Sequence, residues 1–418
     1  MKKYMFITLG LCLCLLSAQY QKVASAFFDA SVPSPTPALE ALLKFEVEIP
    51  ADSPLEEGID LLVLDEVSGL MLNPLRYTMR ARDARNYELE LPFQIGSVLK
   101  YRYARHGNSL VAEYNAQNKP VRYRLFRVDG AGMRVSDIVS RWEDTQSPKE
   151  VGTLEGEISD AQKKKPLVGL LVYCGGNVTK SDKNGKFQIQ GLPPGKHNLV
   201  VNSAEGGYLT FQQEAIITAG NVTLATFSMQ KTETVTMVFS VNVPADTPAH
   251  AQVRIAGSLL QLGNAFRDLR GGVNGKSEQM PLLKQTSEGR YMVALNLPSG
   301  VFVQYKYTLG NGYWNAERDG KAAIRLRQFI VPSQGRLILD EVLTWRDSQK
   351  TPYMIDYLHP FSNPPKKVAV QLYVFQWSET ILLWQTGVNR WTYTLFSPLK
   401  ILPAEFKYRF CLDKQCEE

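Results

Sequence analysis

Hydrophobic and polar residues alternate along much of the chain. Phe45, Val47 and Ile49 are separated by single glutamates. Because successive side chains of a strand point to opposite faces, this pattern predicts a half-buried β-strand over residues 43–49. The same pattern predicts strands at residues 61–64, 87–91, 98–103, 121–128 and 135–142. Helical periodicity is scarce, so residues 43–146 are predicted to form an all-β unit.

The segment 233–347 repeats this unit. Phe-Glu-Val-Glu-Ile-Pro-Ala-Asp-Ser-Pro at 45–54 corresponds to Phe-Ser-Val-Asn-Val-Pro-Ala-Asp-Thr-Pro at 239–248. Further segments correspond in the same order: 87–92 with 291–298, 99–103 with 303–307, and 137–144 with 340–347. This internal duplication predicts two sandwiches of one fold. Trp142 and Trp345, which end the last strand of each copy, are predicted core residues.

Residues 151–230 follow a different pattern. A strand-like apolar run at 166–172 precedes Asp-Lys-Asn-Gly at 182–185, which indicates a hairpin turn because glycine supplies a positive φ. Gly-Leu-Pro-Pro-Gly follows at 191–195. These residues resemble the carboxypeptidase regulatory-like (transthyretin-like) β-sandwich module. The chain as a whole is therefore predicted to be all-β, a tandem array of antiparallel, immunoglobulin-like sandwiches.

The two ends of the chain differ from these units. Lys2, Lys3, an apolar stretch at 7–16 and Ala-Ser-Ala at 24–26 predict a cleaved signal peptide over 1–26, followed by a proline-rich linker at 27–42. Prolines also predict a linker at 348–366. Residues 367–418 begin another strand series, which stops soon after Tyr-Arg-Phe at 408–410, whereas about forty more residues follow the corresponding strand in the earlier copies. This is either a shorter fold or a truncated module. We expect a truncated module, since a sandwich without its closing strands leaves an open edge.

Composition narrows the classes of function. A length of 418 residues with 44% hydrophobic and 21% charged residues fits several folded domains. The net charge of +6 includes no basic run long enough to follow a nucleic acid backbone. No later stretch is apolar enough to span a membrane, so we expect a secreted or surface-exposed protein.

Cysteine and histidine usage indicates no metal and no cofactor. Four histidines lack ligand spacing to a cysteine. Cys411 and Cys416 are close enough to pair, but spacing alone does not establish a disulfide. Cys174 is predicted to be a small buried hydrophobic residue.

The stretch 305–317 carries the candidate binding chemistry. It reads Tyr-Lys-Tyr-Thr-Leu-Gly-Asn-Gly-Tyr-Trp-Asn-Ala-Glu, and places Tyr313, Trp314 and Glu317 after a Gly-Asn-Gly loop. An aromatic ring can stack on the apolar face of a sugar while charged groups bind its hydroxyls. The alternative is that Trp314 caps the core, that Lys306 is solvated, and that Glu317 pairs with Arg325. Similar phrases occur at 101–107 and 408–411.

The 233–347 copy resembles starch-binding carbohydrate-binding modules. The resemblance rests on 239–244, Leu-Gly-Asn at 262–264, Tyr-Lys-Tyr at 305–307, 313–317 and the closing Val-Leu-Thr-Trp at 342–345. It implies glucan binding by Trp314, Lys306, Tyr313 and Glu317, with Phe266 standing near the position where the family has a second tryptophan. The 43–146 copy is degenerate, with Leu-Met-Leu-Asn-Pro at 70–74 and Arg102 in place of the lysine.

Two functions follow as hypotheses. The first is an exported, non-catalytic protein that holds starch or a related α-glucan, or the N-terminal binding region of a larger glycoside hydrolase. The alternative is a surface or adhesion stalk of sandwiches without a sugar ligand. Catalysis within this chain is not expected, because no nucleophile elbow, phosphate loop or zinc-protease motif occurs.

Overall fold

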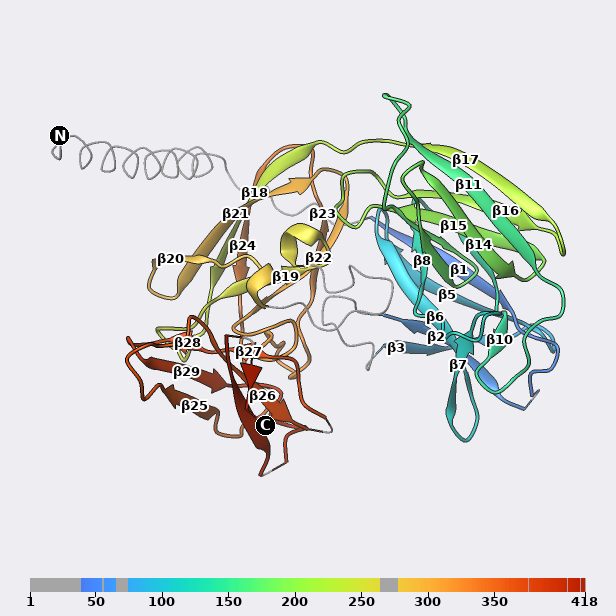
Figure 1. Ribbon diagram of the computed structural model, residues 1–418. Helices are drawn as coiled ribbons and strands as arrows, with labels where there is room; N and C mark the ends of the chain where they lie inside the picture. The colour runs from blue at the N-terminus through green and yellow to red at the C-terminus, as the bar shows by residue number, and fades with distance from the viewer. Residues whose placement is uncertain are drawn as a thin grey trace.

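The computed structural model describes residues 39–54, 56–64, 74–263, 277–374, 376–403, 405–413 and 415–417 (Figure 1). The chain is an all-β protein of tandem sandwiches, as predicted, and its described strands fall into four units. The short 3₁₀ helices η1 (Leu260–Leu262) and η2 (Ser277–Gln279) interrupt the third unit. Within the described ranges, no helix is both long and apolar enough to cross a membrane. The predicted signal peptide lies outside these ranges.

The first unit is a sandwich of two sheets. One sheet has the order β4-β5-β1-β9, and the other has the order β10-β7-β6-β2-β3, with β8 also paired to β6. The alternation at 43–49 buries Leu43, Phe45 and Val47 between the sheets. The strands are β1 (Glu40–Glu48), β2 (Gly58–Val63), β3 (Leu75–Thr78), β4 (Arg80–Ala81), β5 (Asn86–Gln94), β6 (Val98–His106), β7 (Leu110–Tyr114), β8 (Arg124–Arg127), β9 (Arg134–Ile138) and β10 (Arg141–Trp142).

The middle unit has its own core between the sheets β14-β11-β17 and β13-β12-β15-β16. The expected turn at 182–185 is present, and Gly185 there has a φ of 74°. It is not the turn of a hairpin, because it links β13 of one sheet to β14 of the other. Cys174 is buried and free, as predicted. The strands are β11 (Gly152–Asp160), β12 (Leu171–Cys174), β13 (Asn177–Lys180), β14 (Lys186–Leu192), β15 (Gly195–Asn202), β16 (Phe211–Ile217) and β17 (Val222–Met229).

The third unit repeats the first. The sheet β20-β21-β18-β24 contains a parallel pair, β18 with β24, that matches β1 with β9. The facing sheet is β19-β22-β23. The strands are β18 (Thr234–Asn242), β19 (Arg254–Gly257), β20 (Lys284–Ser287), β21 (Arg290–Pro298), β22 (Phe302–Thr308), β23 (Arg327–Ile330) and β24 (Arg336–Glu341).

Side-chain contacts repeat in both copies as well. Trp142 donates its indole N–H to Ser53 Oγ at 2.8 Å, and Trp345 donates to Thr247 Oγ1 at the same distance. Both tryptophans are buried, which confirms them as core residues. The structure therefore places corresponding residues of the two copies in corresponding contacts.

The C-terminal unit contains a strand within the predicted linker. β25 (Tyr353–Leu358) lies within 348–366 and pairs with β29, so the prediction of a linker over this whole range was wrong. Its alternating apolar residues, Tyr353, Ile355 and Tyr357, outweigh the flanking prolines. The sheets are β25-β29-β28 and β27-β26-β30-β31. The remaining strands are β26 (Val368–Tyr373), β27 (Ile381–Leu382), β28 (Trp384–Gln385), β29 (Arg390–Leu395), β30 (Lys407–Leu412) and β31 (Gln415–Cys416), and a disulfide joins Cys411 to Cys416.

The units are packed against one another. Tyr123 of the first and Tyr173 of the middle unit stack at 5.6 Å, and their hydroxyl oxygens lie 3.1 Å apart. Gln261 of the third unit donates to Glu205 O of the middle unit at 3.0 Å. The third and C-terminal units share one hydrophobic cluster. Figure 1 shows the first and middle units on one side of the molecule and the third and C-terminal units on the other.

Candidate functional site

The predicted sugar-binding loop follows β22 and is held in shape by its own polar groups. The backbone N–H groups of Tyr313 and Trp314 both donate to Asn311 Oδ1 at 2.8 Å. Thr308 Oγ1 donates to Asn311 O at 2.7 Å. Asn315 adopts a left-handed conformation with φ of 55°. These contacts fix the backbone of the loop that carries Trp314.

Trp314 is a core residue and not an exposed stacking surface. It is 4% exposed and belongs to the hydrophobic cluster shared by the third and C-terminal units. Of the two possibilities that the sequence left open, its position matches a cap on the core. A tryptophan with so little exposed surface offers no ring face on which a sugar could stack.

The C-terminal unit covers the loop through Asn315. Asn315 Nδ2 donates to Thr394 O at 2.7 Å, and Asn315 Oδ1 accepts from the N–H groups of Phe396 at 2.8 Å and Ser397 at 3.1 Å. A Cβ on Gly310 would lie 2.5 Å from the Tyr393 hydroxyl. The loop that the resemblance assigned to glucan binding is thus an interface between two units.

Lys306 and Tyr313 are also withdrawn from solvent. Lys306 is fully buried in the middle of β22, so it does not lie on a solvated strand face. Tyr313 is half-buried, with its ring 5.6 Å from that of Trp314. Phe266, the fifth candidate, lies outside the described residues.

Glu317 is buried in a polar network that holds the sandwich together. Its Oε1 accepts the Tyr307 N–H at 2.7 Å and pairs with Arg327, and not with Arg325, the alternative partner that the sequence offered. Arg325 instead donates to Glu341 O at 3.0 Å. Burial raises the pKa of Glu317, and the Arg327 guanidinium opposes this shift.

The same network occurs in the first copy, which indicates a structural role. Glu113 accepts the Tyr103 N–H at 3.2 Å and pairs with Arg124 at 3.1 Å. Arg124 also pairs with Asp137 at 3.0 Å, and Asp137 accepts the hydroxyls of two tyrosines, as Asp340 does in the third unit. A group repeated in the degenerate copy stabilises the fold that both copies share.

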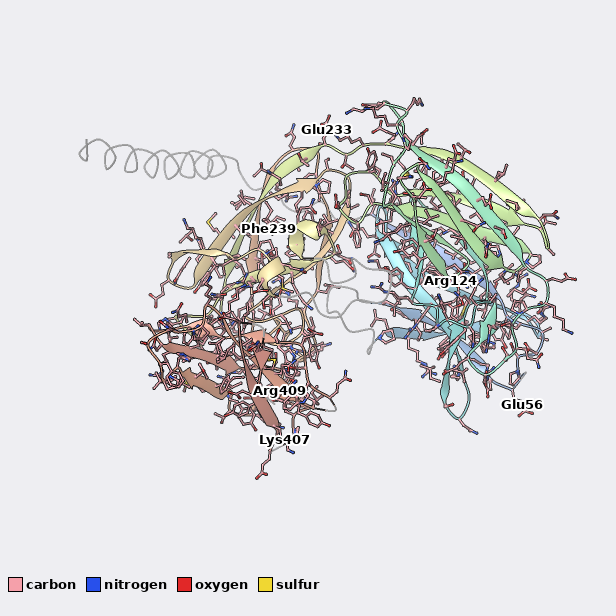
Figure 2. All side chains as sticks on the ribbon, viewed as in Figure 1. Glu56, Arg124, Glu233, Phe239, Lys407 and Arg409 are labelled. Carbon is pink, nitrogen blue, oxygen red and sulfur yellow. A yellow bond between two sulfur atoms is a disulfide. The ribbon has the colours of Figure 1, made fainter. Side chains whose placement is uncertain are left out.

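An aromatic cluster on the C-terminal unit was missed as a site. Tyr373, 42% exposed, contacts the half-buried Trp377 with ring centroids 5.3 Å apart. The guanidinium of Arg409 lies 4.3 Å from the Trp377 ring centroid. Gln371 accepts from Arg409 Nε at 2.9 Å. We name these four residues the Trp377 cluster, and Figure 2 labels Arg409 and Lys407 on their strand.

The signal for this cluster was present in the sequence. Arg409 is the middle residue of Tyr-Arg-Phe at 408–410, the last of the three related motifs. It occupies in β30 the position that Lys306 holds in β22. The aromatic partner comes from the turn after β26. Tyr373 and Trp377 face each other there as an isolated bridge. The three-dimensional arrangement thus places a tryptophan, a tyrosine, a cation and an amide together at the surface.

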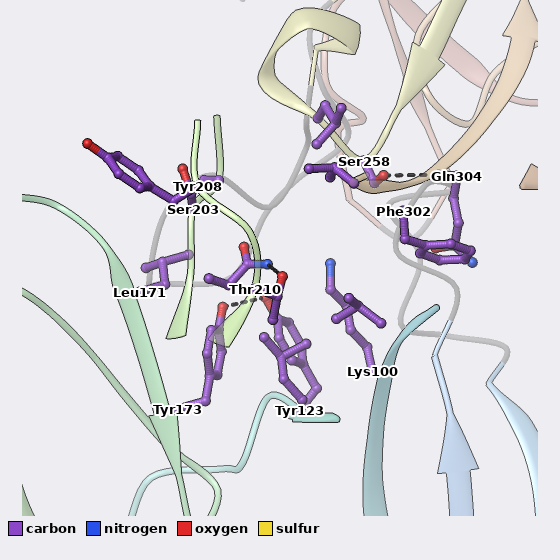
Figure 3. A pocket seen from close by; sticks show the side chains of 16 residues that line it. Lys100, Tyr123, Leu171, Tyr173, Ser203, Tyr208, Thr210, Ser258, Phe302 and Gln304 are labelled. Atoms are coloured by element: carbon purple, nitrogen blue, oxygen red, sulfur yellow. Dashed lines mark hydrogen bonds between the residues drawn. The ribbon is translucent and has the colours of Figure 1, made fainter. Parts of the chain in front are cut away.

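A cavity at the junction of three units is too small for a glycan. It has a volume of about 60 Å³ and is lined by Lys100 and Tyr123, by Tyr173 and Tyr208, and by Ser258 and other residues of the third unit (Figure 3). Ligand pockets usually have volumes of roughly 300–1,000 Å³. We therefore interpret the junction as a packing defect between the units.

Comparison with known proteins gives limited matches. No protein-family model matches the chain. A stretch of 112 residues is 30% identical to an alpha-amylase of Niallia circulans and covers 27% of this chain but only 8% of the amylase. Part of the chain is thus similar in sequence to a small part of an enzyme named for amylase activity.

Solved structures show similarity in fold alone. The Bacillus anthracis TIE protein is 12% identical, with 91% of this chain and 66% of that chain covered and a TM-score of 0.20. A streptococcal ancillary pilin is 11% identical, with 73% and 99% covered and a TM-score of 0.25. The family 15 glucoamylase of Hypocrea jecorina is 18% identical, with 28% and 19% covered and a TM-score of 0.20.

Proposed function

We propose that this chain is an exported, non-catalytic polysaccharide-binding protein, or the binding region of a longer glycoside hydrolase, that holds starch or a related α-glucan. The amylase match supports the carbohydrate part of this proposal. The sugar would bind at the surface of the C-terminal unit, and not at the buried Trp314.

The Trp377 cluster is the observation on which the proposal depends. Arg409 and Tyr373 hold the Trp377 ring on an otherwise solvated sheet face. Gln371 and the backbone of Ser378 are linked by a hydrogen bond of 2.8 Å, so the amide beside the rings is fixed in orientation. Aromatic faces and a positioned amide supply the apolar contact and the hydrogen bonds that a sugar ring requires.

The test is a titration of the whole chain with maltoheptaose, together with sedimentation on insoluble starch. Trp377→Ala should weaken binding roughly tenfold or more, equivalent to about 1.4 kcal/mol. Phe361→Ala removes a 69% exposed aromatic residue from the same unit and should leave affinity unchanged. Wild-type protein that binds neither form of glucan would refute the proposal.

Burial of Trp314 favours a second candidate, a structural stalk. The loop after β22, which was predicted to bind sugar, forms an interface with the C-terminal unit. Hydrogen bonds also connect the middle unit to the third and to the first unit. A stalk requires this kind of rigid connection and no ligand. Failure of every glucan to bind at millimolar concentration, with the fold intact by circular dichroism, would favour this candidate.

A further inference from the structure

An open groove of about 810 Å³ runs between the first and middle units. The first unit contributes Arg102 and the segment 115–123, which contains Gln117 and Lys119. The middle unit contributes strands β13 and β14, including the exposed Gln188 and Gln190. The groove lies outside the segment 233–347 that resembles starch-binding modules.

The two walls of the groove are fixed relative to each other. Asn115 Nδ2 donates to Asn177 Oδ1 at 2.9 Å, and Gln117 Nε2 donates to Gln190 O at 2.8 Å, both across the gap. Asn115 Oδ1 also accepts the N–H groups of Gln117 and Lys119, which fixes the loop. A Cβ on Gly176 would lie 2.8 Å from Val121 Cγ2, so the units approach closely there. A preformed groove loses little entropy when a ligand binds.

The groove is lined with amides that are connected to one another. Gln190 Nε2 donates to Gln188 Oε1 at 3.1 Å, and Gln188 Nε2 donates to Glu155 Oε1 at 2.7 Å. Each carboxamide has two N–H donors and an acceptor oxygen, so both glutamines keep hydrogen-bonding groups for solvent or ligand. Neighbouring donors and acceptors in fixed positions match the adjacent hydroxyls of a sugar chain.

Aromatic rings do not provide a stacking surface here. Tyr123 and Tyr173 line the groove, but both are buried and stacked on each other. Single-stranded nucleic acids depend on exposed aromatic rings for base stacking, so they fit this groove poorly. Arg102 and Lys119 add positive charge, which would also accommodate a sugar chain that carries uronates.

We propose that this groove is a second glycan-binding site, in which the amides of Gln117, Gln188 and Gln190 bind hydroxyls of an extended polysaccharide. The inference rests on the proposed polysaccharide-binding function. The groove binds by polar contacts, in contrast to the aromatic Trp377 cluster. Two sites on one chain would bind a long polysaccharide with greater avidity than either alone.

The experiment compares the whole chain with three variants: Trp377→Ala, the double variant Gln188→Ala/Gln190→Ala, and the combination of all three changes. Calorimetric titrations use maltoheptaose as the neutral probe and oligogalacturonate as the charged probe. The double variant should lose at least roughly fivefold in affinity for one probe at the groove, equivalent to about 1 kcal/mol. The probe whose affinity falls identifies whether the polysaccharide that binds in the groove is neutral or acidic. Gln285→Ala, an exposed glutamine on β20, is the matched control.

The outcomes separate this inference from the proposed function. Loss of groove binding in the double variant, with Trp377-dependent binding retained, supports the inference. Binding that requires Trp377 but is unaffected by the double variant overturns the groove and leaves the proposed function standing. A wild-type chain that binds neither probe overturns both. Oligothymidylate that binds as tightly as either sugar, and weakens in the double variant, overturns the assignment to glycans.

Discussion

At the scale of single residues, the position of Trp314 determines how the third unit can be used. Truncation of a buried tryptophan leaves a cavity, so Trp314→Ala should lower the free energy of unfolding by about 3–5 kcal/mol in urea titrations. Glucan affinity at the Trp377 cluster should persist under conditions where the variant is folded. Unchanged stability combined with lost binding would instead show that Trp314 contacts sugar.

The buried network of the first unit predicts a large effect for one arginine. Arg124 pairs with both Glu113 and Asp137, so Arg124→Met leaves two buried carboxylates without their cation. The expected loss of stability is about 3–5 kcal/mol. Arg134→Met, which removes an exposed pair with Glu46, should cost less than about 1 kcal/mol. Similar losses in both variants would contradict this interpretation.

A cluster of charged residues on the surface of the first unit predicts that the stability of the fold depends on pH. Hydrogen bonds from Lys44 and Arg80 lower the pKa of Glu88 from 4.5 to about 2. Because the folded-state pKa is the lower one, the stabilisation is present above pH 4.5 and is lost as the pH falls towards 2. The thermal midpoint of Glu88→Gln should therefore fall less steeply than that of the wild type as the pH is lowered from 4.5 to 2. Glu90→Gln, exposed on the same strand, should reproduce the wild-type curve.

At the scale of elements, the loop after β22 couples two units through Asn315. Asn315→Gly keeps the left-handed backbone at φ of 55° available but removes three hydrogen bonds to residues 394–397. We expect a loss of about 1–3 kcal/mol, measured by chemical denaturation. Lys164→Gly, at an exposed position with the same φ of 55°, serves as the matched control for the introduction of a glycine. A loss no larger than the control's would contradict a coupling role for the side chain.

The sequence predicted the strands more reliably than the environment of each side chain. Alternation located β1 and β6, and the duplication correctly identified Trp142 and Trp345 as core residues. Local patterns could not reveal that Asn315, next to Trp314, forms hydrogen bonds with residues some eighty positions later. They also did not identify Arg327 as the partner of Glu317, because the choice between Arg325 and Arg327 depends on strand geometry.

At the scale of the whole molecule, removal of the C-terminal unit should uncover the predicted loop. A chain that ends at residue 347 lacks the C-terminal residues of the hydrophobic cluster to which Trp314 belongs. Acrylamide should then quench its fluorescence more strongly than in the whole chain, and Trp314→Phe in the short chain should abolish the increase. Quenching that is equal in both chains would show that the third unit alone buries the ring.

The shared core of the third and C-terminal units also bears on how the chain folds as it is synthesised. The first and middle units can close their own cores early, because each cluster is completed by nearby residues. The third unit needs residues up to Leu402 to complete the cluster to which Trp314 belongs. At about 5–20 residues per second, the ribosome leaves this apolar surface uncovered for several seconds. A chaperone that binds the nascent chain would therefore find its longest-lived target in residues 234–347.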